Sequence, residues 1–312
     1  MKRWQANLIL GIVALIWGST FVMVQNALDA VDPLSFVGLR FIVATLCLLV
    51  LFGKRVRGVT RAELIAGGLI GVWLVGGYAF QTIGLESTTT AKAGFITGLS
   101  VVIVPLLSTV LLLRPPGRGP VLGIVAATGG LALLTLNINL SIQTGAPWVQ
   151  LTLDDGFSIQ PGDLWVLACA FMFALHIVSV ARYSPQYDSI RLSIIQIAVV
   201  APLALTGAFA FEKPTLDLPA STWGAIIFTG VVATALVFSL QVYVQRFTTP
   251  THTALLFALE PVFAAFFGWW LANEELGSRE IVGCALILLG MVFAELGDSA
   301  AEPDTAPAAA AD

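Results

Sequence analysis

The sequence predicts an all-α integral membrane protein with ten transmembrane helices, arranged as two inverted five-helix repeats with both termini in the cytoplasm. Of its 312 residues, 57% are hydrophobic and only 11% are charged, whereas a soluble domain carries about 25% charge. Apolar stretches also recur at the length of about 20 residues that a bilayer-spanning helix needs. Finally, the two halves of the chain share a pattern of polar residues and glycines.

The apolar stretches are continuous and do not alternate with polar residues, which favours helices over the strands of a membrane barrel. We expect spans at residues 7–27, 34–53, 62–83, 91–112, 119–136, 163–182, 190–211, 222–244, 252–272 and 278–297.

Basic residues predict the orientation of these spans. With the N-terminus inside, eleven Lys and Arg residues fall on the cytoplasmic side and only Arg40, Lys92, Lys213 and Arg279 on the other. This bias matches the positive-inside rule. An even number of spans then returns the C-terminus to the cytoplasm, and we expect a multi-pass protein of a bacterial-type inner (cytoplasmic) membrane.

The internal repeat appears at two shifts of the sequence. A shift of 156 pairs Asp32 with Asp188 and Thr20 with His176, and a shift of 160 pairs Gln81 with Gln241, Ser100 with Glu260, Gly123 with Gly283 and Gly130 with Gly290. Because each half has an odd number of spans, the second half must be inverted relative to the first. Inverted repeats are common in secondary transporters, with the substrate site near the midplane between them.

Four segments follow from this division. They are a first five-helix repeat at 1–136, an external linker at 137–162, a second repeat at 163–297 and a tail at 298–312, which is small, acidic and expected to be disordered. Within the linker, residues 148–153 followed by Asp154-Asp155-Gly156 are compatible with a small hairpin or with a plain connection.

Enzyme chemistry is not expected. The two histidines, His176 and His252, form no zinc-protease motif, and a phosphate-binding loop is absent. Cys47, Cys169 and Cys284 all fall within spans, and their odd number argues against a disulfide or metal framework. We therefore predict no catalytic residues, no metal and no cofactor. The expected partners are a small-molecule substrate, the lipid bilayer and, as a candidate, protons, with no nucleic acid.

Glu260 is the most informative polar residue. It lies eight residues into a span, and a carboxylate there costs at least about 2.5 kcal/mol, so it should face a cavity or a partner. It is a candidate for carrying a proton or for receiving a substrate ammonium. The alternative is a structural carboxylate that bonds to another helix or to backbone near Pro261.

His176 is the second candidate for proton coupling, because histidine changes charge near neutral pH. The alternative is a hydrogen bond between helices. Arg40, about 9 Å into its span at ~1.5 Å per residue, could hold a substrate carboxylate, snorkel outward or pair with Asp32.

Other polar and aromatic side chains are expected to line a central cavity, since polar groups within a membrane must bond to something. Trp165 has an interfacial anchor as its alternative role. The candidate lining residues are Trp17, Thr20, Tyr78, Gln81, Thr82, Thr97, Ser100, Trp165, His176, Ser239, Gln241, Tyr243 and Glu260.

Several of these positions lie in motifs that resemble the drug/metabolite transporter superfamily, specifically its ten-helix EamA-type exporters. The motifs are Trp17-Gly18-Ser19, Asp32-Pro33 followed by Arg40, Phe95-Ile96-Thr97-Gly98-Leu99 through Val104-Pro105-Leu106-Leu107, and Glu260-Pro261 followed by Gly268-Trp269-Trp270-Leu271 and Glu274. Two departures are Phe173-Ala174 in place of a tryptophan pair, and Gln196, which aligns with Arg40 but carries no charge.

The resemblance implies a secondary transporter that exports small metabolites by alternating access. Amino acids, aromatic or otherwise neutral, are the first expected substrates, with amphipathic or cationic drugs as a further class. A facilitator or exchanger of another small metabolite is the alternative, and a non-transporting membrane scaffold or sensor is the next one.

Overall fold

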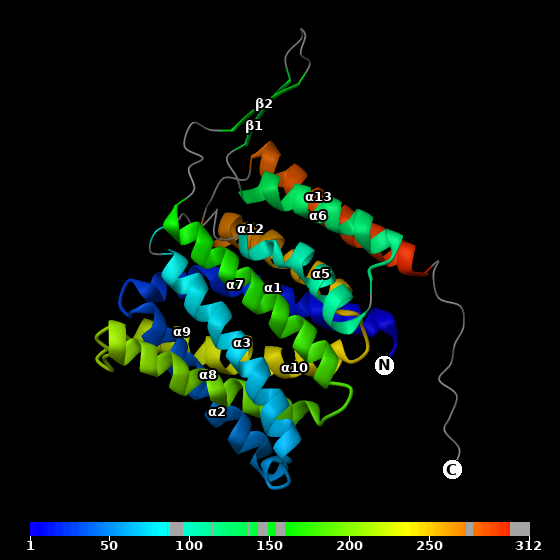
Figure 1. Cartoon of the computed structure of the whole chain (residues 1–312). Coiled ribbons are helices and arrows are strands. Elements are labelled where there is room, and N and C mark those ends of the chain that lie inside the picture. The colour runs from blue at the N-terminus through cyan, green and yellow to red at the C-terminus, as the bar shows by residue number, and fades with distance from the viewer. Residues whose placement is uncertain are drawn as a thin grey trace, which may run out of the picture.

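The computed structural model describes residues 1–85, 87, 96–113, 115–135, 138–142, 149–153, 160–272 and 277–299. Helices make up most of it (Figure 1). In chain order they are α1 (Arg3–Leu28), α2 (Pro33–Val56), α3 (Arg61–Leu85), α5 (Ser100–Leu112), α6 (Arg118–Thr135), α7 (Pro161–Tyr183), α8 (Ser189–Phe211), α9 (Ala220–Gly230), the π-helix η1 (Val231–Leu236), α10 (Val237–Gln245), α11 (Pro250–Phe257), α12 (Leu259–Ala272) and α13 (Ser278–Ser299).

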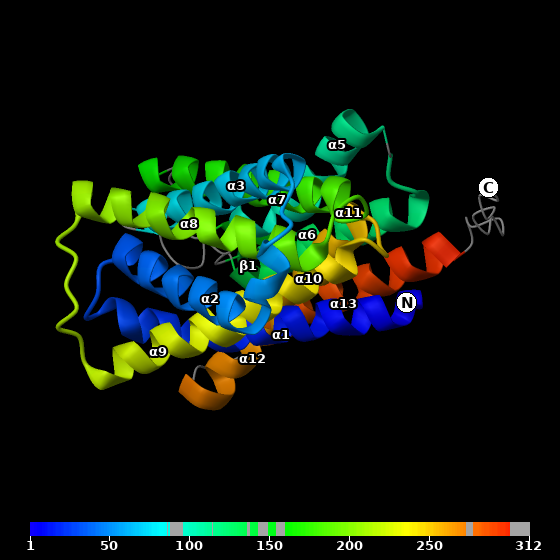
Figure 2. The ribbon, with the colours of Figure 1, turned by 90° about the horizontal axis from the view of Figure 1, so that it is seen from below.

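Within the described residues, six helices are long and apolar enough to cross a membrane. They are Pro33–Val56, Arg61–Gln81, Pro161–Tyr183, Ser189–Phe211, Ala220–Gln245 and Pro250–Phe267. Three shorter apolar helices accompany them, at Trp4–Thr20, Ile96–Leu112 and Arg118–Leu133. A multi-pass helical membrane protein is therefore confirmed, while the number of ten spans and the cytoplasmic position of the termini stay predictions. The start of α1 and the end of α13 lie at the same end of the bundle (Figure 2).

One element departs from the predicted all-α class. Strands β1 (Ile138–Ile142) and β2 (Val149–Leu153) form an antiparallel hairpin in which Ile138 lies opposite Leu153, and it projects away from the helices (Figure 1). The strand foreseen at 148–153 is thus present, but its partner precedes it, because the apolar and β-branched residues at 138–142 supply the pairing edge. The foreseen turn at residues 154–156 lies outside the described residues.

Several helices begin at residues suited to that position. Proline at the first position of α2 and α7 has its ring angle preset for a helix and needs no hydrogen-bond partner. At the start of α8 the Asp188 side chain accepts a bond from the Arg191 amide, and at α11 Thr249 does the same for His252. These residues fix where each membrane segment starts.

Packing joins helices from the two halves of the chain. α6 lies along α13, α2 along α8, α3 against α7 and α8, and α1 against α10 and α12. Glycines permit the closest of these approaches: a Cβ on Gly123 would stand 2.5 Å from the Gly290 carbonyl oxygen, and one on Gly130 would stand 2.5 Å from the Gly283 carbonyl oxygen. Small residues let membrane helices approach at backbone distance.

Polar contacts join α2 and α8 at both of their ends. At one end Arg55 pairs with Asp188 at 2.8 Å, and Arg191 pairs with Glu63 of α3 at 3.2 Å. At the other end the Glu212 carboxylate accepts bonds from the amides of Leu34 and Ser35, at 2.7 and 2.8 Å. Between these ends the helices enclose an apolar core that includes Phe41, Leu74, Ile197 and Phe238.

Candidate functional site

Aromatic rings from six helices meet at the centre of the bundle. Trp17 of α1 lies with its ring centroid 5.3 Å from that of Phe238 and 5.1 Å from that of Phe257. Tyr78 of α3 contacts Phe41 of α2 at 5.3 Å and Phe173 of α7 at 5.6 Å. Trp17 and Phe238 are tilted at 55°, and the other three pairs are edge-on, so that ring edges meet ring faces, which is favourable for aromatic contacts.

Arg40 lies within this aromatic group and is only 6% exposed. Its Nε donates to the Thr234 hydroxyl oxygen at 2.6 Å, and its Nη2 donates to the Ala233 carbonyl oxygen at 3.2 Å. Its guanidinium carbon is 5.4 Å from the Tyr78 ring centroid. The sequence predicted three alternative roles for Arg40: binding of a substrate carboxylate, snorkelling toward the membrane surface, or pairing with Asp32. The structure turns it inward, onto neutral oxygens and an aromatic ring.

Arg40 lies in α2, but its hydrogen-bond acceptors belong to the π-helix η1, which joins α9 to α10. The Ala233 carbonyl in this turn also accepts a hydrogen bond from the Trp17 indole Nε1 at 2.9 Å. Both lone pairs of this oxygen are therefore used by side chains of α1 and α2. Gly230 brings the same helix close to α2, because a Cβ there would stand 2.9 Å from the Arg40 carbonyl oxygen.

Glu260, in the first turn of α12, faces the same region. The Glu260 carboxyl lies within electrostatic range of Arg40, Tyr78 and Cys169. No ion pair joins it to Arg40: among the described residues the ion pairs are Arg55–Asp188, Arg191–Glu63 and Arg279–Glu280. Glu260 is partly exposed although it lies deep among the helices. An ionisable residue at such a depth in a membrane protein faces the interior of the bundle or a water-filled space.

Side chains of α3, α7 and the segment before α5 form a polar group that reaches the neighbourhood of Glu260 at Cys169. Gln81 donates from Nε2 to the Thr97 hydroxyl oxygen at 3.3 Å, and that hydroxyl lies 3.9 Å from the Cys169 sulfur. The structure thus brings together five of the predicted residues, namely Trp17, Tyr78, Gln81, Thr97 and Glu260. It adds Cys169 to them, and it places Arg40, for which binding of a substrate carboxylate was one of three predicted roles, in the same group.

His176 belongs to a second, more enclosed polar cluster. It is 2% exposed, and its Nε2 lies 2.9 Å from the Gln196 side-chain oxygen. Nearby on α10, Gln241 donates to Gln245, which in turn donates to the Ile177 carbonyl oxygen at 2.7 Å. The structure therefore supplies the hydrogen bond between helices that was the alternative role of His176.

The other candidates lie apart from the central group. The hydroxyls of Thr20 and Ser239 donate to carbonyls of their own helices, at Trp17 and Ala235. Ser100 is partly buried at the start of α5. The side chain of Thr82 lies outside the described part.

Two aromatic candidates face outward. Trp165 is 44% exposed and lies 5.5 Å from Phe80, as an interfacial anchor would. Tyr243 is 45% exposed and contacts Phe247. Both therefore stand apart from the ring cluster around Trp17.

Several residues at the centre escaped sequence reasoning. Thr234, Cys169 and the phenylalanines are ordinary residues of apolar spans, and only their neighbours in space make them notable. Arg40 had a signal, because it was the one base deep within a predicted span. Among the described residues, no cluster of three or more His, Cys, Asp or Glu side chains could hold a metal ion.

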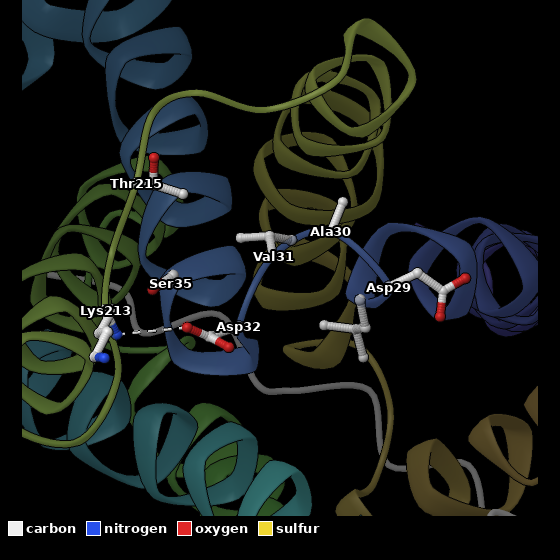
Figure 3. Close-up of a pocket in the computed structure, with 8 residues that line it drawn as sticks. Asp29, Ala30, Val31, Asp32, Ser35, Lys213 and Thr215 are labelled. Carbon is white, nitrogen blue, oxygen red and sulfur yellow. Dashed lines mark hydrogen bonds between the residues drawn. The ribbon is translucent and has the colours of Figure 1, made fainter.

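A separate pocket of about 250 Å³ opens between the end of α1, the start of α2 and the segment after α8 (Figure 3). Asp29, Asp32, Ser35, Lys213 and Thr215 line it together with apolar residues. The Lys213 amide reaches Asp32 Oδ2 at 3.5 Å, a long contact. Its residues belong to helix ends and connections, away from the aromatic centre.

Long apolar helices around a buried charged and aromatic centre define a membrane protein with a polar site inside it. Comparison with known proteins gives the family. The profile of the EamA-like transporter family matches residues 4–136 and again 160–295. The chain belongs to this family, which is part of the drug/metabolite transporter superfamily, and is a small-molecule transporter of the membrane.

Relatives agree with this class. A protein of Archaeoglobus fulgidus described as an uncharacterized transporter is 31% identical over 95% of this chain and 87% of its own length. The Bacillus subtilis transporter YoaV is 25% identical over 91% and 95%, and the Escherichia coli inner membrane transporter YedA is 23% identical over 91% and 88%. A solved crystal structure that is 20% identical covers 96% of this chain and all of its own, with a TM-score of 0.78, which shows the fold.

Proposed function

We propose that this transporter exports small metabolites that carry both an acidic and a basic group on a compact, partly apolar body. Amino acids with aromatic or other neutral side chains are the first such class. Amphipathic or cationic drugs are a separate second class, which shares only the basic group and the apolar body. The observation that carries the proposal is the pair of opposite charges, Arg40 and Glu260, within one ring of aromatic side chains.

The two charges suit the two ends of a zwitterion. A guanidinium recognises a carboxylate through parallel N–H groups, and the Glu260 carboxylate can receive an ammonium. The rings of Trp17 and Tyr78 supply apolar and cation-attracting surface between them. Arg40 is the only basic residue deep within the predicted spans, so a substrate that carries several phosphates would find too little positive charge.

We also propose that the two halves act as inverted repeats and alternate the side to which this centre opens. The glycine contacts between α6 and α13 support it. In the shift of 160, Gly123 corresponds to Gly283 and Gly130 to Gly290. The contact of Gly123 with Gly290 therefore maps onto the contact of Gly283 with Gly130, and both are present. Such a reciprocal pair of contacts is expected when a two-fold axis relates the two halves.

Counterflow in proteoliposomes tests the proposed function. Proteoliposomes that contain the purified protein are loaded with unlabelled solute. Entry of labelled tryptophan, leucine, tryptamine or indole-3-propionate into them is then followed. We expect exchange of the two amino acids, with loss of at least about tenfold in rate for Arg40→Gln and for Glu260→Gln. Arg57→Gln and Asp217→Asn, which change exposed charges, are the matched controls.

The same assay separates the alternatives. Exchange without net efflux would make the protein an exchanger, and equal rates for every solute and variant would remove Arg40 and Glu260 from the site. If no solute exchanges at all, the scaffold or sensor reading is favoured.

A further inference from the structure

The anchoring of Arg40 leaves part of its guanidinium for other partners. Of its five N–H donors, one at Nε bonds to Thr234 and one at Nη2 bonds to Ala233, while the Tyr78 side chain is a further neighbour of the guanidinium. Both acceptors, the Thr234 hydroxyl and the Ala233 carbonyl, are neutral. The positive charge is therefore held in place without being neutralised by an ion pair.

This arrangement differs from that of a buried arginine with a purely structural role. Buried charges are ordinarily compensated by a hydrogen-bonded counter-charge, because desolvation of an unpaired ion is costly. Among the residues that the structure describes, Glu260 is the carboxyl group near Arg40, and no ion pair joins the two. A missing counter-charge next to a partly exposed carboxyl points to an anionic group that arrives from outside the chain.

The local backbone is built around this anchor. In a π-helix the carbonyl bonds to an amide five residues on, as Val232 does with Val237, and π-turns are frequent at functional sites. In η1, the carbonyl oxygen of Ala233 points toward Trp17 and Arg40 and accepts a hydrogen bond from each. The same turn also sets Thr234, which is fully buried, with its hydroxyl 2.6 Å from Arg40 Nε.

We infer that Thr234 is a positioning residue for substrate recognition, which fixes the guanidinium of Arg40 so that its unbonded edge receives a carboxylate of the transported solute. The inference rests on the proposed function and deepens it, since it assigns to Thr234 and η1 the selectivity for carboxylate-bearing solutes over their decarboxylated amines. Thr234 touches Arg40 and not the solute.

The test compares Thr234→Val with Thr234→Ser. Valine keeps the shape of threonine but cannot accept the bond from Nε, whereas serine restores the hydroxyl. Thr229→Val is the matched control, because Thr229 is equally buried and its hydroxyl bonds only within its own helix, at Ala225. Melting temperatures in detergent show which variants remain folded.

Binding is measured on purified protein in detergent by calorimetry, with indole-3-propionate and tryptophan as carboxylate probes and tryptamine as the probe without a carboxylate. We expect Thr234→Val to weaken binding of both carboxylates about tenfold, with tryptamine unchanged and Thr234→Ser close to the unmodified protein. Thr229→Val should leave all three affinities unchanged.

Equal losses for tryptamine and the carboxylates, or no loss for any probe, would overturn the inference, as would failure of the serine variant to restore binding. Unmodified protein that binds neither carboxylate overturns it as well. Binding with the expected pattern, but without exchange in proteoliposomes, would instead overturn the proposed export and leave the role of Thr234 supported.

Discussion

Gly18 of α1 lies directly against the backbone of Glu260 in α12. A Cβ placed on Gly18 would stand 2.8 Å from the Glu260 carbonyl oxygen and 2.6 Å from the Phe263 Cβ. Because one of these atoms belongs to the backbone, it cannot rotate away, and only glycine allows α1 and α12 to meet there. The position of the Glu260 carboxyl is thus set in part by a residue that has no side chain.

Gly18→Ala should displace α12 and lower both stability and transport. Overpacking of this kind costs about 1–3 kcal/mol, so we expect a lower melting temperature in detergent and weaker exchange in proteoliposomes. Gly11→Ala is the control on the same helix, since no atom lies within 4 Å of a Cβ there. Similar melting temperatures for the two variants would contradict the contact between α1 and α12.

Glu260→Gln tests whether Glu260 carries a proton. If it does, a pH gradient should speed transport by the unmodified protein and have no effect on the variant, because the amide cannot change its charge. Transport is measured with and without the gradient, and Asp217→Asn, at an exposed position, should behave as the unmodified protein does. A variant that still responds to the gradient shows that another group is the carrier.

Gln196→Leu should destabilise the protein through His176. The imidazole is buried, and Gln196 is the hydrogen-bond partner of its Nε2. Leaving one buried polar group without its partner costs about 1–3 kcal/mol. Thermal unfolding in detergent measures this loss, and Gln186→Leu, at an exposed position, is the control. If His176 served only as a proton carrier, the melting temperature would stay unchanged while the pH profile of transport moved.

Arg191→Gln should loosen the contact of α8 with α3. Arg191 Nη1 reaches both Glu63 oxygens at 3.2 Å, and its Nε donates to the Arg55 carbonyl oxygen at 3.0 Å. Since Arg191 keeps a 26% exposed side chain, we expect a loss of about 1–2 kcal/mol. Unfolding at low and high salt checks it, with a smaller difference at high salt. Arg57→Gln should have no such effect, and equal losses for both would assign the change to net charge alone.

Sequence reasoning predicted the helical membrane class because that class depends on local composition. Long apolar runs with few charges have no other stable form in lipid. The α6–α13 glycines were also visible as paired positions, although their contact depends on how the helices cross. The hairpin was only half predicted, since strand pairing needs a partner whose position a single stretch of sequence does not specify.

The site was predicted less completely, for a physical reason. Glu260, Gln81 and Trp17 stood out because polar and large aromatic groups are costly or informative within a span. Thr234 did not stand out, because threonine commonly satisfies its own helix, as Thr229 does. Only the π-turn and the approach of α2 convert it into the partner of Arg40, and neither is encoded by a local pattern. Tyr243 shows the converse, since a polar aromatic residue beside Gln241 faces outward.

The π-helix η1 coincides with a difference in length between the two halves of the chain. Gly71 contacts the carbonyl of Gln196 as Gly230 contacts the carbonyl of Arg40, and these two pairs are equivalent in the proposed repeats. Gly71 and Gly230 are 159 positions apart, whereas Gln81 and Gln241 are 160 apart. The second half therefore holds one additional residue between these points, and η1 lies within that stretch. In the proposed repeats, a difference of one residue in length is accommodated by a wider helical turn, and that turn carries the two groups that anchor Arg40.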